Sequence, residues 1–384
     1  MKKLFILILF VILSNTNLNA QWEQCNGPYG KFIYTITTNN NNIFVGTNIG
    51  LFLSTDDGLT WNPKNSGFPN PDIRCIAFTT NNIFVGILGA GVFISSNSGD
   101  TWIQKINGLD RTDVYCMSIY DNNIFVGTDG GIFLSTDNGN NWTPKNKGLS
   151  STFISSICKY NNNLFIATYK GIFQSTDNGN NWIPKNIGLT DTTILSIYIK
   201  DDNIFAGTYE GGIFVSTDNG NNWVQKNSGL TCKEVTSFCQ SGNFIFTGTY
   251  EEGVFLSTNN GNNWIKKNNG FIYGNIYCLS TNDNYIFAGT NYDGIYRAKL
   301  GDITNVVDKY LLTENIIFPN PASDFLNINS ENIIGKDIII YDMLGNKLMS
   351  VTAAGVETRM NIGTLSSGVY FVRIGEITKM FVKE

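Results

Sequence analysis

The chain has 384 residues, a length that accommodates two or three domains. Its formal net charge is −5 and only 15% of its residues are charged, so no basic patch indicates a nucleic-acid partner. The sequence contains no histidine. It therefore cannot build Ser-His-Asp or Cys-His nucleophilic sites or histidine metal sites, and we expect no metal and no cofactor.

Residues 1–20 are typical of a secretory signal peptide. Lys2 and Lys3 precede an apolar run from Leu4 to Leu13, which is too short to span a bilayer. Leu18 to Ala20 fit a cleavage site, after which the mature chain would begin at Gln21. The rest of the sequence contains no candidate transmembrane segment.

An eight-residue motif, which we call the box, recurs six times. The third copy reads STDNGNNW, from Ser135 to Trp142. Its Asp, Asn and Gly residues are typical of a tight turn, because Asp accepts hydrogen bonds from nearby backbone N–H groups and Gly tolerates positive φ. A fixed period of this length predicts a propeller, a solenoid or an array. The copies are 40 or 41 residues apart and end at Trp61, Trp102, Trp142, Trp182, Trp223 and Trp264.

Each repeat contains three β-rich segments before its box and one after it, which we name A, B, C and D. Trp22 to Gly27 matches a D segment, and Ile276 to Arg297 matches an A–B–C set that no box follows. These two fragments would complete one sheet if they paired. We therefore predict an all-β fold in which residues 21–299 form a monomeric, closed, seven-bladed β-propeller.

The box resembles the Asp-box of bacterial sialidases, sortilin-type receptors and related β-propellers. The resemblance implies a structural turn at the periphery of each blade, away from any active site. Asn in two of the copies fits this role, because Asn can accept the same local hydrogen bond. The residues expected to have it are Asp56, Asn97, Asp137, Asp177, Asp218 and Asn259, together with the Trp that ends each box.

A lysine stands three residues after each box Trp, and two interpretations are open. In the first, the lysines protect the outer edge strands from aggregation. In the second, they form a binding site for a polyanion. The six lysines are Lys64, Lys105, Lys145, Lys185, Lys226 and Lys267.

Five of the seven cysteines occupy A-segment positions at which other repeats carry small residues. This pattern predicts small buried side chains near the propeller axis rather than a disulfide framework. Cys25 and Cys232 lie outside the pattern, and the sequence leaves a bridge between them open.

Residues 300–315 lack the repeat and are predicted to be a linker. Residues 316–384 contain Asn320-Pro321-Ala322, then Tyr341-Asp342 with Gly345, then a final stretch from Gly368 to Lys383. In this order the motifs resemble the type A C-terminal sorting domain of type IX secretion substrates. The resemblance implies a small β-sandwich that is handled by the type IX secretion machinery, export to the cell surface or beyond, and removal of the segment. An ordinary β-sandwich used for adhesion is the alternative.

The D–A and B–C loops of a propeller share one face, opposite the boxes. The B–C loops are the most variable part of this repeat, and four of them carry Tyr, mostly beside an acid. Tyr and carboxylate suit sugar stacking, hydroxyl recognition or a basic partner. We therefore expect non-catalytic binding of a glycan or protein. The candidate binding residues are Tyr169, Tyr209, Glu210, Tyr250, Glu251, Tyr292 and Asp293.

Two other functions stay open. A glycoside hydrolase needs only two suitably spaced carboxylates, for which Asp129, Glu210, Glu251 and Asp293 are candidates. The sialidase pattern is incomplete, because the predicted propeller holds only three arginines and no FRIP-like segment. The third function is an assembly factor, by analogy with the propeller that helps photosystem II assembly.

Overall fold

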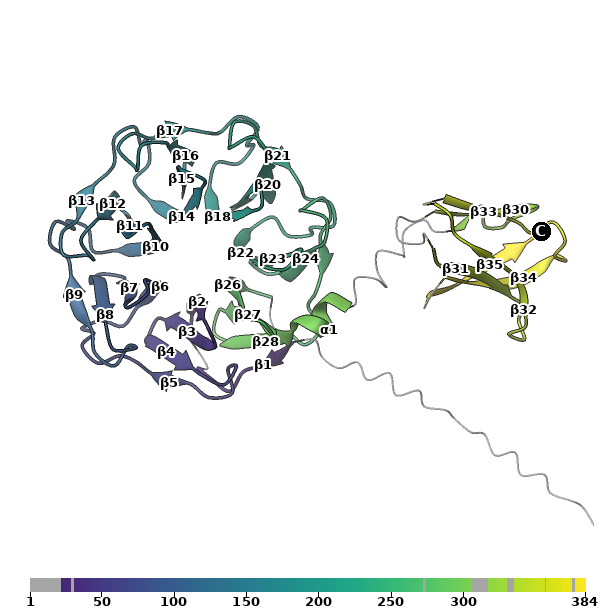
Figure 1. Ribbon diagram of the computed structural model, residues 1–384, viewed down its shortest axis with the longest axis horizontal. Coiled ribbons are helices and arrows are strands. Elements are labelled where there is room, and N and C mark those ends of the chain that lie inside the picture. The colour runs from purple at the N-terminus through teal and green to yellow at the C-terminus, as the bar shows by residue number, and fades with distance from the viewer. Residues whose placement is uncertain are drawn as a thin grey trace, which may run out of the picture. The chain divides into compact units, whose positions relative to one another are not determined.

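The computed structural model describes residues 22–28, 31–271, 274–305, 317–329, 335–355, 357–374 and 377–384. The chain divides into two compact units, Met1–Lys299 and Leu300–Glu384, and the first is a ring of sheets around an axis (Figure 1). The predicted signal peptide lies outside the described residues. The predicted linker begins with helix α1 (Leu300–Asn305), and most of its remainder also lies outside them.

Seven four-stranded antiparallel sheets, which we call blades 1 to 7, make up the ring (Figure 1). In each of them, strand A lies nearest the axis and strand D lies at the rim. The strands of blades 1 to 3 are β2 (Ile33–Asn39), β3 (Asn42–Thr47), β4 (Gly50–Ser54) and β5 (Asn62–Pro63); β6 (Ile73–Phe78), β7 (Ile83–Ile87), β8 (Gly91–Ser95) and β9 (Ile103–Lys105); β10 (Val114–Tyr120), β11 (Asn123–Thr128), β12 (Gly131–Ser135) and β13 (Thr143–Pro144). Those of blades 4 to 6 are β14 (Ile154–Tyr160), β15 (Asn163–Thr168), β16 (Gly171–Ser175) and β17 (Ile183–Pro184); β18 (Ile194–Lys200), β19 (Asn203–Thr208), β20 (Ile213–Ser216) and β21 (Val224–Gln225); β22 (Val235–Ser241), β23 (Phe244–Thr249), β24 (Gly253–Ser257) and β25 (Ile265–Lys266). Blade 7 contains β26 (Ile276–Thr281), β27 (Tyr285–Thr290), β28 (Ile295–Lys299) and β1 (Glu23–Gln24).

The two ends of the propeller sequence meet in blade 7. Strand β1 pairs with β28, so that Glu23 lies opposite Arg297 and Gln24 opposite Tyr296. The Trp22 side chain is only 1% exposed, and its Nε1–H donates to the carbonyl of Lys267 in blade 6 at 2.7 Å. The N-terminal fragment thus supplies the rim strand of the last blade, as its sequence predicts.

Neighbouring blades pack face to face through apolar side chains. Between blades 3 and 4, Phe125 and Leu134 from one sheet meet Ile154 and Ile166 from the other, and Trp182 closes the cluster. Because side chains alternate along a strand, each B and C strand sends residues to both neighbouring blades, so these strands are buried almost throughout. This packing confirms the all-β propeller class.

The box forms a tight turn held by its own side chains. Ser135 Oγ donates to Asp137 Oδ1 at 2.8 Å, and the backbone N–H of Asn141 donates to the same oxygen at 2.9 Å. Hydrogen bonds from the Asn141 side chain and backbone hold the pKa of the Asp137 carboxyl below its usual value. Asn97 accepts the equivalent backbone bond at 3.0 Å and Asn259 at 2.9 Å. Asn therefore makes the same turn as Asp.

The lysines that follow the box Trp residues link neighbouring blades, a contact that neither interpretation of the sequence included. Lys145 Nζ, for example, donates to Asn180 Oδ1 in the next box at 2.6 Å. Each box Trp after the first also reaches back with its Nε1–H to the carbonyl of such a lysine, as Trp182 does to Lys145 at 2.7 Å. The lysine pairs are Lys64–Asp100, Lys105–Asn140, Lys145–Asn180, Lys185–Asn221 and Lys226–Asn262.

All seven cysteines are free, so the bridge between Cys25 and Cys232 that the sequence left open is not formed. Cys25 stands in β1's blade at the position that lysine occupies after the box Trp residues, and Cys232 Sγ donates to the Tyr250 carbonyl at 2.9 Å. The A-strand cysteines pack near the axis, where burial raises the pKa of the Cys75 thiol to about 12.

The second unit contains two small sheets with a common core. One holds β29 (Ile317–Phe318), β30 (Phe325–Asn329) and β33 (Glu357–Asn361). The other holds β31 (Asp337–Tyr341), β32 (Lys347–Thr352), β34 (Gly368–Ile374) and β35 (Ile377–Lys383). Leu326 and Ile328 from the first sheet pack with Ile338, Ile340 and Val372 from the second. The small β-domain expected here is therefore present.

Candidate functional site

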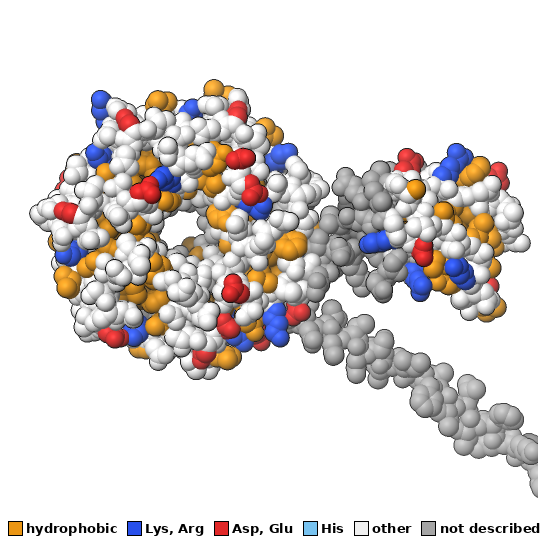
Figure 2. Space-filling view, viewed as in Figure 1, with side chains coloured by type: hydrophobic (Ala, Val, Ile, Leu, Met, Phe, Trp, Pro, Cys, Tyr) orange, Lys and Arg blue, Asp and Glu red, His pale blue; other side chains and the backbone are white. Residues whose placement is uncertain are grey.

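Every blade presents one half-buried side chain at the axial end of its inner strand. The pairing register shifts there, as between Ile33 and Thr35 in blade 1, so the intervening residue is a bulge. A bulge re-aims a side chain out of the usual alternation. The start of each inner strand lies opposite the end of strand B, as Ile33 lies opposite Thr47, so the seven residues surround the axis on the face of the B–C loops. Figure 2 shows the ring hollowed at its centre, and we call this opening the mouth of the axial channel. They are Tyr34, Arg74, Tyr115, Ser155, Leu195, Thr236 and Tyr277.

Five aromatic side chains from blades 6, 7 and 1 form a continuous group at this mouth, which we call the aromatic arc. Tyr250 meets Tyr277 edge-to-face at 6.0 Å, and Tyr277 meets Phe32 edge-to-face at 6.3 Å. Phe32 in turn contacts Tyr292 at 4.3 Å and stacks with Tyr34 at 5.8 Å. Tyr292 is 59% exposed and the other four rings are half-buried, so part of each ring remains open to solvent.

One end of the arc, at Tyr34, contacts the guanidinium group of Arg74. The Arg74 guanidinium lies 3.7 Å from the centre of the Tyr34 ring, a cation–π distance. Arg74 Nε also donates to Asp72 Oδ1 at 2.7 Å, and its Nη2 donates to Asp72 Oδ2 at 3.2 Å. The positive charge of Arg74, which borders the arc, is therefore neutralised by the Asp72 carboxylate.

Two glutamates lie at the other end of the arc. Burial raises the pKa of Glu234, and the negative charge of Glu251 raises it further. Burial raises the pKa of Tyr277 to about 12, with further contributions from Tyr250 and Glu234. Because these groups influence one another's charge, Glu234, Glu251, Tyr250 and Tyr277 lie in one small region of the mouth.

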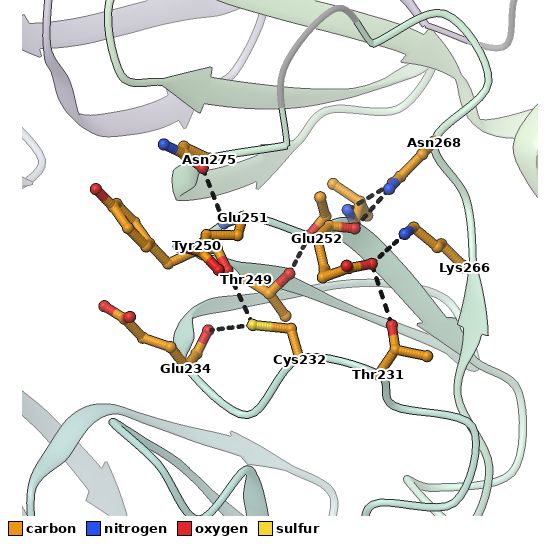
Figure 3. Close-up of polar contacts among 12 residues, drawn as sticks. Thr231, Cys232, Glu234, Thr249, Tyr250, Glu251, Glu252, Lys266, Asn268 and Asn275 are labelled. Carbon is orange, nitrogen blue, oxygen red and sulfur yellow. Dashed lines mark hydrogen bonds and ion pairs between the residues drawn. The ribbon is translucent and has the colours of Figure 1, made fainter.

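Several polar contacts of its backbone hold the B–C loop of blade 6 in place (Figure 3). Asn275 Oδ1 accepts the backbone N–H of Glu251 at 2.9 Å, and the Tyr250 N–H donates to the Glu234 carbonyl at 3.0 Å. Glu251 has a φ of 82°, and Tyr292 at the corresponding loop of blade 7 has a φ of 72°. Residues with a Cβ seldom adopt this region, and it is often found at functional loops.

The structure brings together only some of the predicted binding residues. Tyr250, Glu251 and Tyr292 belong to the arc or border it. Tyr169 stacks on Phe153 at 4.3 Å in a separate aromatic group with Tyr115. The remaining three predicted residues lie elsewhere on the same loops: Tyr209, Glu210 and Asp293.

Tyr209 is 48% exposed and makes no ring contact with the described residues. The backbone N–H of its neighbour Glu210 donates to Asp191 Oδ2 at 2.7 Å. Burial raises the pKa of Asp293, whose Oδ2 has no hydrogen-bond donor among the described residues. The four acids considered for hydrolysis, Asp129, Glu210, Glu251 and Asp293, come from four different blades.

Sequence reasoning missed Phe32, Tyr34, Arg74, Glu234 and Tyr277. All five lie on the D–A side, directly before or after the first buried residue of an inner strand. The sequence does contain a signal for these site residues. Their positions vary strongly from repeat to repeat, whereas the positions beside them are nearly constant.

The opposite face carries a different kind of concavity. A polar cavity of about 620 Å³ lies among the A–B loops of blades 1, 6 and 7. Its lining includes Asn40, Gln240 and Asp283 and contains no aromatic ring. The two faces therefore differ in chemistry.

Models of known protein families match parts of both units. Residues 316–384 match the secretion system C-terminal sorting domain, and residues 89–186 and 119–252 match the DUF6242 beta propeller domain. Among curated proteins, no sequence matches the chain. In the described part of the chain, no helix has the length and apolar character needed to cross a membrane.

Solved propellers share the fold at low sequence identity. PorZ, a surface component of the type IX secretion system of Porphyromonas gingivalis, is 16% identical, with a TM-score of 0.56, over 92% of this chain and 59% of PorZ. YCF48 bound to D1 peptide is 15% identical, with a TM-score of 0.61, over 73% of this chain and 97% of YCF48.

The GH74 enzyme of Niastella koreensis is 15% identical, with a TM-score of 0.55, over 70% of this chain and 43% of the enzyme. The chain thus spans less than two thirds of both PorZ and this enzyme. Its sorting domain directs it through the type IX secretion system to the cell surface or the extracellular space. The chain is therefore a β-propeller protein that carries a type IX secretion C-terminal sorting domain.

Proposed function

We propose that the protein is a non-catalytic surface propeller that binds a glycan or protein partner at the channel mouth, on the face of the B–C loops. The observation that carries this proposal is the aromatic arc. Contiguous exposed aromatic rings bordered by carboxylates are typical of recognition surfaces, because they offer apolar area together with polar anchors.

Several features of the arc support binding. Tyr250 and Tyr292 lie on separate B–C loops yet reach one another through Tyr277 and Phe32, so the surface is held by two blades and the start of a third. Rings packed at 4 to 6 Å from one another lose little freedom when a ligand binds, which favours affinity.

The similar propeller YCF48 is bound to a peptide, so the fold can hold a peptide ligand. PorZ is a surface component of the same secretion system that sorts this chain. Both likenesses support a binding role, and neither names the partner of this protein.

The glycoside hydrolase alternative has less support. Its candidate acids come from four blades, and the similarity to the GH74 enzyme covers less than half of that enzyme. A pair of carboxylates on one cleft would be needed to protonate and displace a leaving group.

Binding to a glycan array and to isolated cell-surface protein tests the proposal directly. We expect the variant Tyr250→Ala/Tyr292→Ala to lose binding at least tenfold while its thermal unfolding stays close to that of the wild type. Tyr209→Ala is the matched control, because Tyr209 is an equally placed loop tyrosine outside the arc. Binding that survives the double substitution would contradict the proposed face.

A further inference from the structure

The beginnings of the inner strands of blades 6 and 7 lie side by side. Thr236 Oγ in β22 donates to the carbonyl of Ile276 in β26 at 2.6 Å. The Tyr250 N–H donates to the Glu234 carbonyl at 3.0 Å, and the Glu251 N–H donates to Asn275 Oδ1 at 2.9 Å. These bonds bring together Glu234, Tyr250, Glu251 and Tyr277, which we call the niche.

The two carboxylates of the niche have no partner within the described part of the chain. Neither Glu234 nor Glu251 forms an ion pair or a side-chain hydrogen bond with any described residue. The next residue, Glu252, is different, since Lys266 pairs with it and Thr231 Oγ1 donates to it at 3.2 Å (Figure 3). Figure 3 shows the Tyr250 ring and the Glu234 carboxylate extending toward the same side.

Blades 1 and 2 contain the same combination of groups with a cation in place. Asp72 directly precedes the first residue of its inner strand, Arg74 follows that residue, and Tyr34 occupies the corresponding position in the neighbouring blade. The Arg74 guanidinium binds both Asp72 oxygens and lies on the Tyr34 ring.

The niche repeats this arrangement without its cation. Glu234 corresponds to Asp72, and Tyr277 corresponds to Tyr34 on the following rather than the preceding blade. The position of Arg74 is occupied by Thr236. A carboxylate and a tyrosine ring thus face the same channel mouth, and Glu251 adds a second negative charge.

We infer that the niche binds the guanidinium or ammonium group of a basic segment in a protein partner. Such a group would lie between the two negative carboxylates and reduce their mutual repulsion. Its N–H groups would donate charge-assisted hydrogen bonds to the carboxylates, and its positive charge would lie against the faces of Tyr250 and Tyr277. A neutral sugar would leave both carboxylates without a counter-charge. The inference rests on the proposed binding face and names the chemistry of its ligand.

The probe for this inference is N-acetyl-tetra-arginine amide, titrated calorimetrically into the whole secreted chain, with cellohexaose as a neutral comparison. We expect the peptide to bind, to bind more weakly as NaCl is added, and to lose at least tenfold in affinity in Glu234→Gln/Glu251→Gln. Glu252→Gln is the matched control and should bind as the wild type does. Thr236→Arg supplies the cation from within and should block the peptide.

Three results would overturn the inference. They are a wild type that does not bind the peptide, a double Gln variant that binds it unchanged, and cellohexaose binding in its place. Thermal unfolding of each variant separates a lost site from a lost fold. If the peptide fails while Tyr250→Ala/Tyr292→Ala still abolishes partner binding, the cationic ligand is wrong and the binding face stands.

Discussion

Glu23 and Arg297 lie opposite each other in the two strands that join the ends of the propeller, with Glu23 Oε1 2.8 Å from Arg297 Nε. The Arg297 guanidinium also donates to the Asp57 carbonyl in blade 1 and lies 4.8 Å from the Tyr285 ring. A single side chain from blade 7 thus contacts the rim strand of its own blade and the box of the next. Blade 7 has Cys25 at the position from which a lysine contacts the next box in other blades, and Arg297 makes a contact with the box of blade 1 instead.

Removing Arg297 should weaken the ring more than removing its partner. The Arg297 side chain is 11% exposed and that of Glu23 is 57% exposed. We expect Arg297→Ala to lower the free energy of unfolding by about 2–3 kcal/mol, because it leaves the Asp57 carbonyl without a donor. Glu23→Ala should cost only about 0–1 kcal/mol, as exposed ion pairs do. Urea unfolding measures both, and equal losses would contradict this account of the closure.

The box tryptophans should differ in their contribution to stability. Trp142 is 4% exposed and its Nε1–H donates to the Lys105 carbonyl at 3.0 Å, so Trp142→Ala should cost ~3–5 kcal/mol. Trp61, in the box of blade 1, is the box Trp next to blade 7, in which Cys25 stands at the lysine position. Its Nε1 has no hydrogen-bond partner among the described residues. We expect Trp61→Ala to cost less. A loss under ~1 kcal/mol for Trp142→Ala would contradict its burial.

Gln174 is predicted to be a weak point of blade 4. Its side chain is 5% exposed, and its Nε2 has no acceptor among the described residues. The equivalent positions of other blades hold Leu53, Leu134 and Leu256. Gln174→Leu should therefore raise the free energy of unfolding by about 1–2 kcal/mol, because it removes an unsatisfied buried amide.

The reverse change, Leu134→Gln in blade 3, is the matched control for this prediction. It should destabilise by about 1–3 kcal/mol. If Gln174→Leu is destabilising, the amide has an acceptor that holds it in place.

Lys267 should make the ring sensitive to pH. It is 2% exposed and lacks the box partner that the other D-strand lysines have, because blade 7 has no box. Burial lowers its pKa from 10.5 to about 8. Between about pH 8 and pH 10.5, Lys267 is protonated in the unfolded chain and neutral in the folded chain. The free energy of unfolding therefore rises as the pH rises through this range. Below about pH 8 both forms are protonated and the full penalty remains.

Lys267→Met should accordingly stabilise the protein by about 2 kcal/mol at pH 7, and by less at pH 10. Lys226→Met is the control, since Lys226 Nζ donates to Asn262 Oδ1 at 2.8 Å. Chemical unfolding at the two pH values measures both variants. A gain that is the same at pH 7 and pH 10 would show that the ammonium of Lys267 is not the cause.

The box period and the complementary end fragments were sufficient to predict the propeller, because repeats of one supersecondary unit are visible in the residues themselves. The bonds between blades were not predicted. Lys145 follows one box and Asn180 lies in the next, 35 residues further along the chain, so no local pattern marks their pairing. The lysine and the box asparagine recur with the same period in the sequence, but whether they touch depends on how far adjacent sheets are offset from one another.

The binding site was only partly predicted for a similar reason. Tyr250 and Tyr292 could be recognised because they are tyrosines in the B–C loops, the most variable part of the repeat. Tyr34 and Tyr277 sit at bulges, and a bulge breaks the two-residue alternation from which side-chain direction is inferred. Glu234 could not be assigned to the site without knowing which strand ends are adjacent.

Hydrogen exchange of the whole secreted chain, with and without a partner captured from the cell surface, tests the central claim most directly. The account predicts that the partner slows exchange in the loops around Tyr250 and Tyr292 and at the start of β26, and leaves the boxes unchanged. Slower exchange confined to the A–B loops around Asn40, Gln240 and Asp283 would place the partner on the opposite face and contradict the claim.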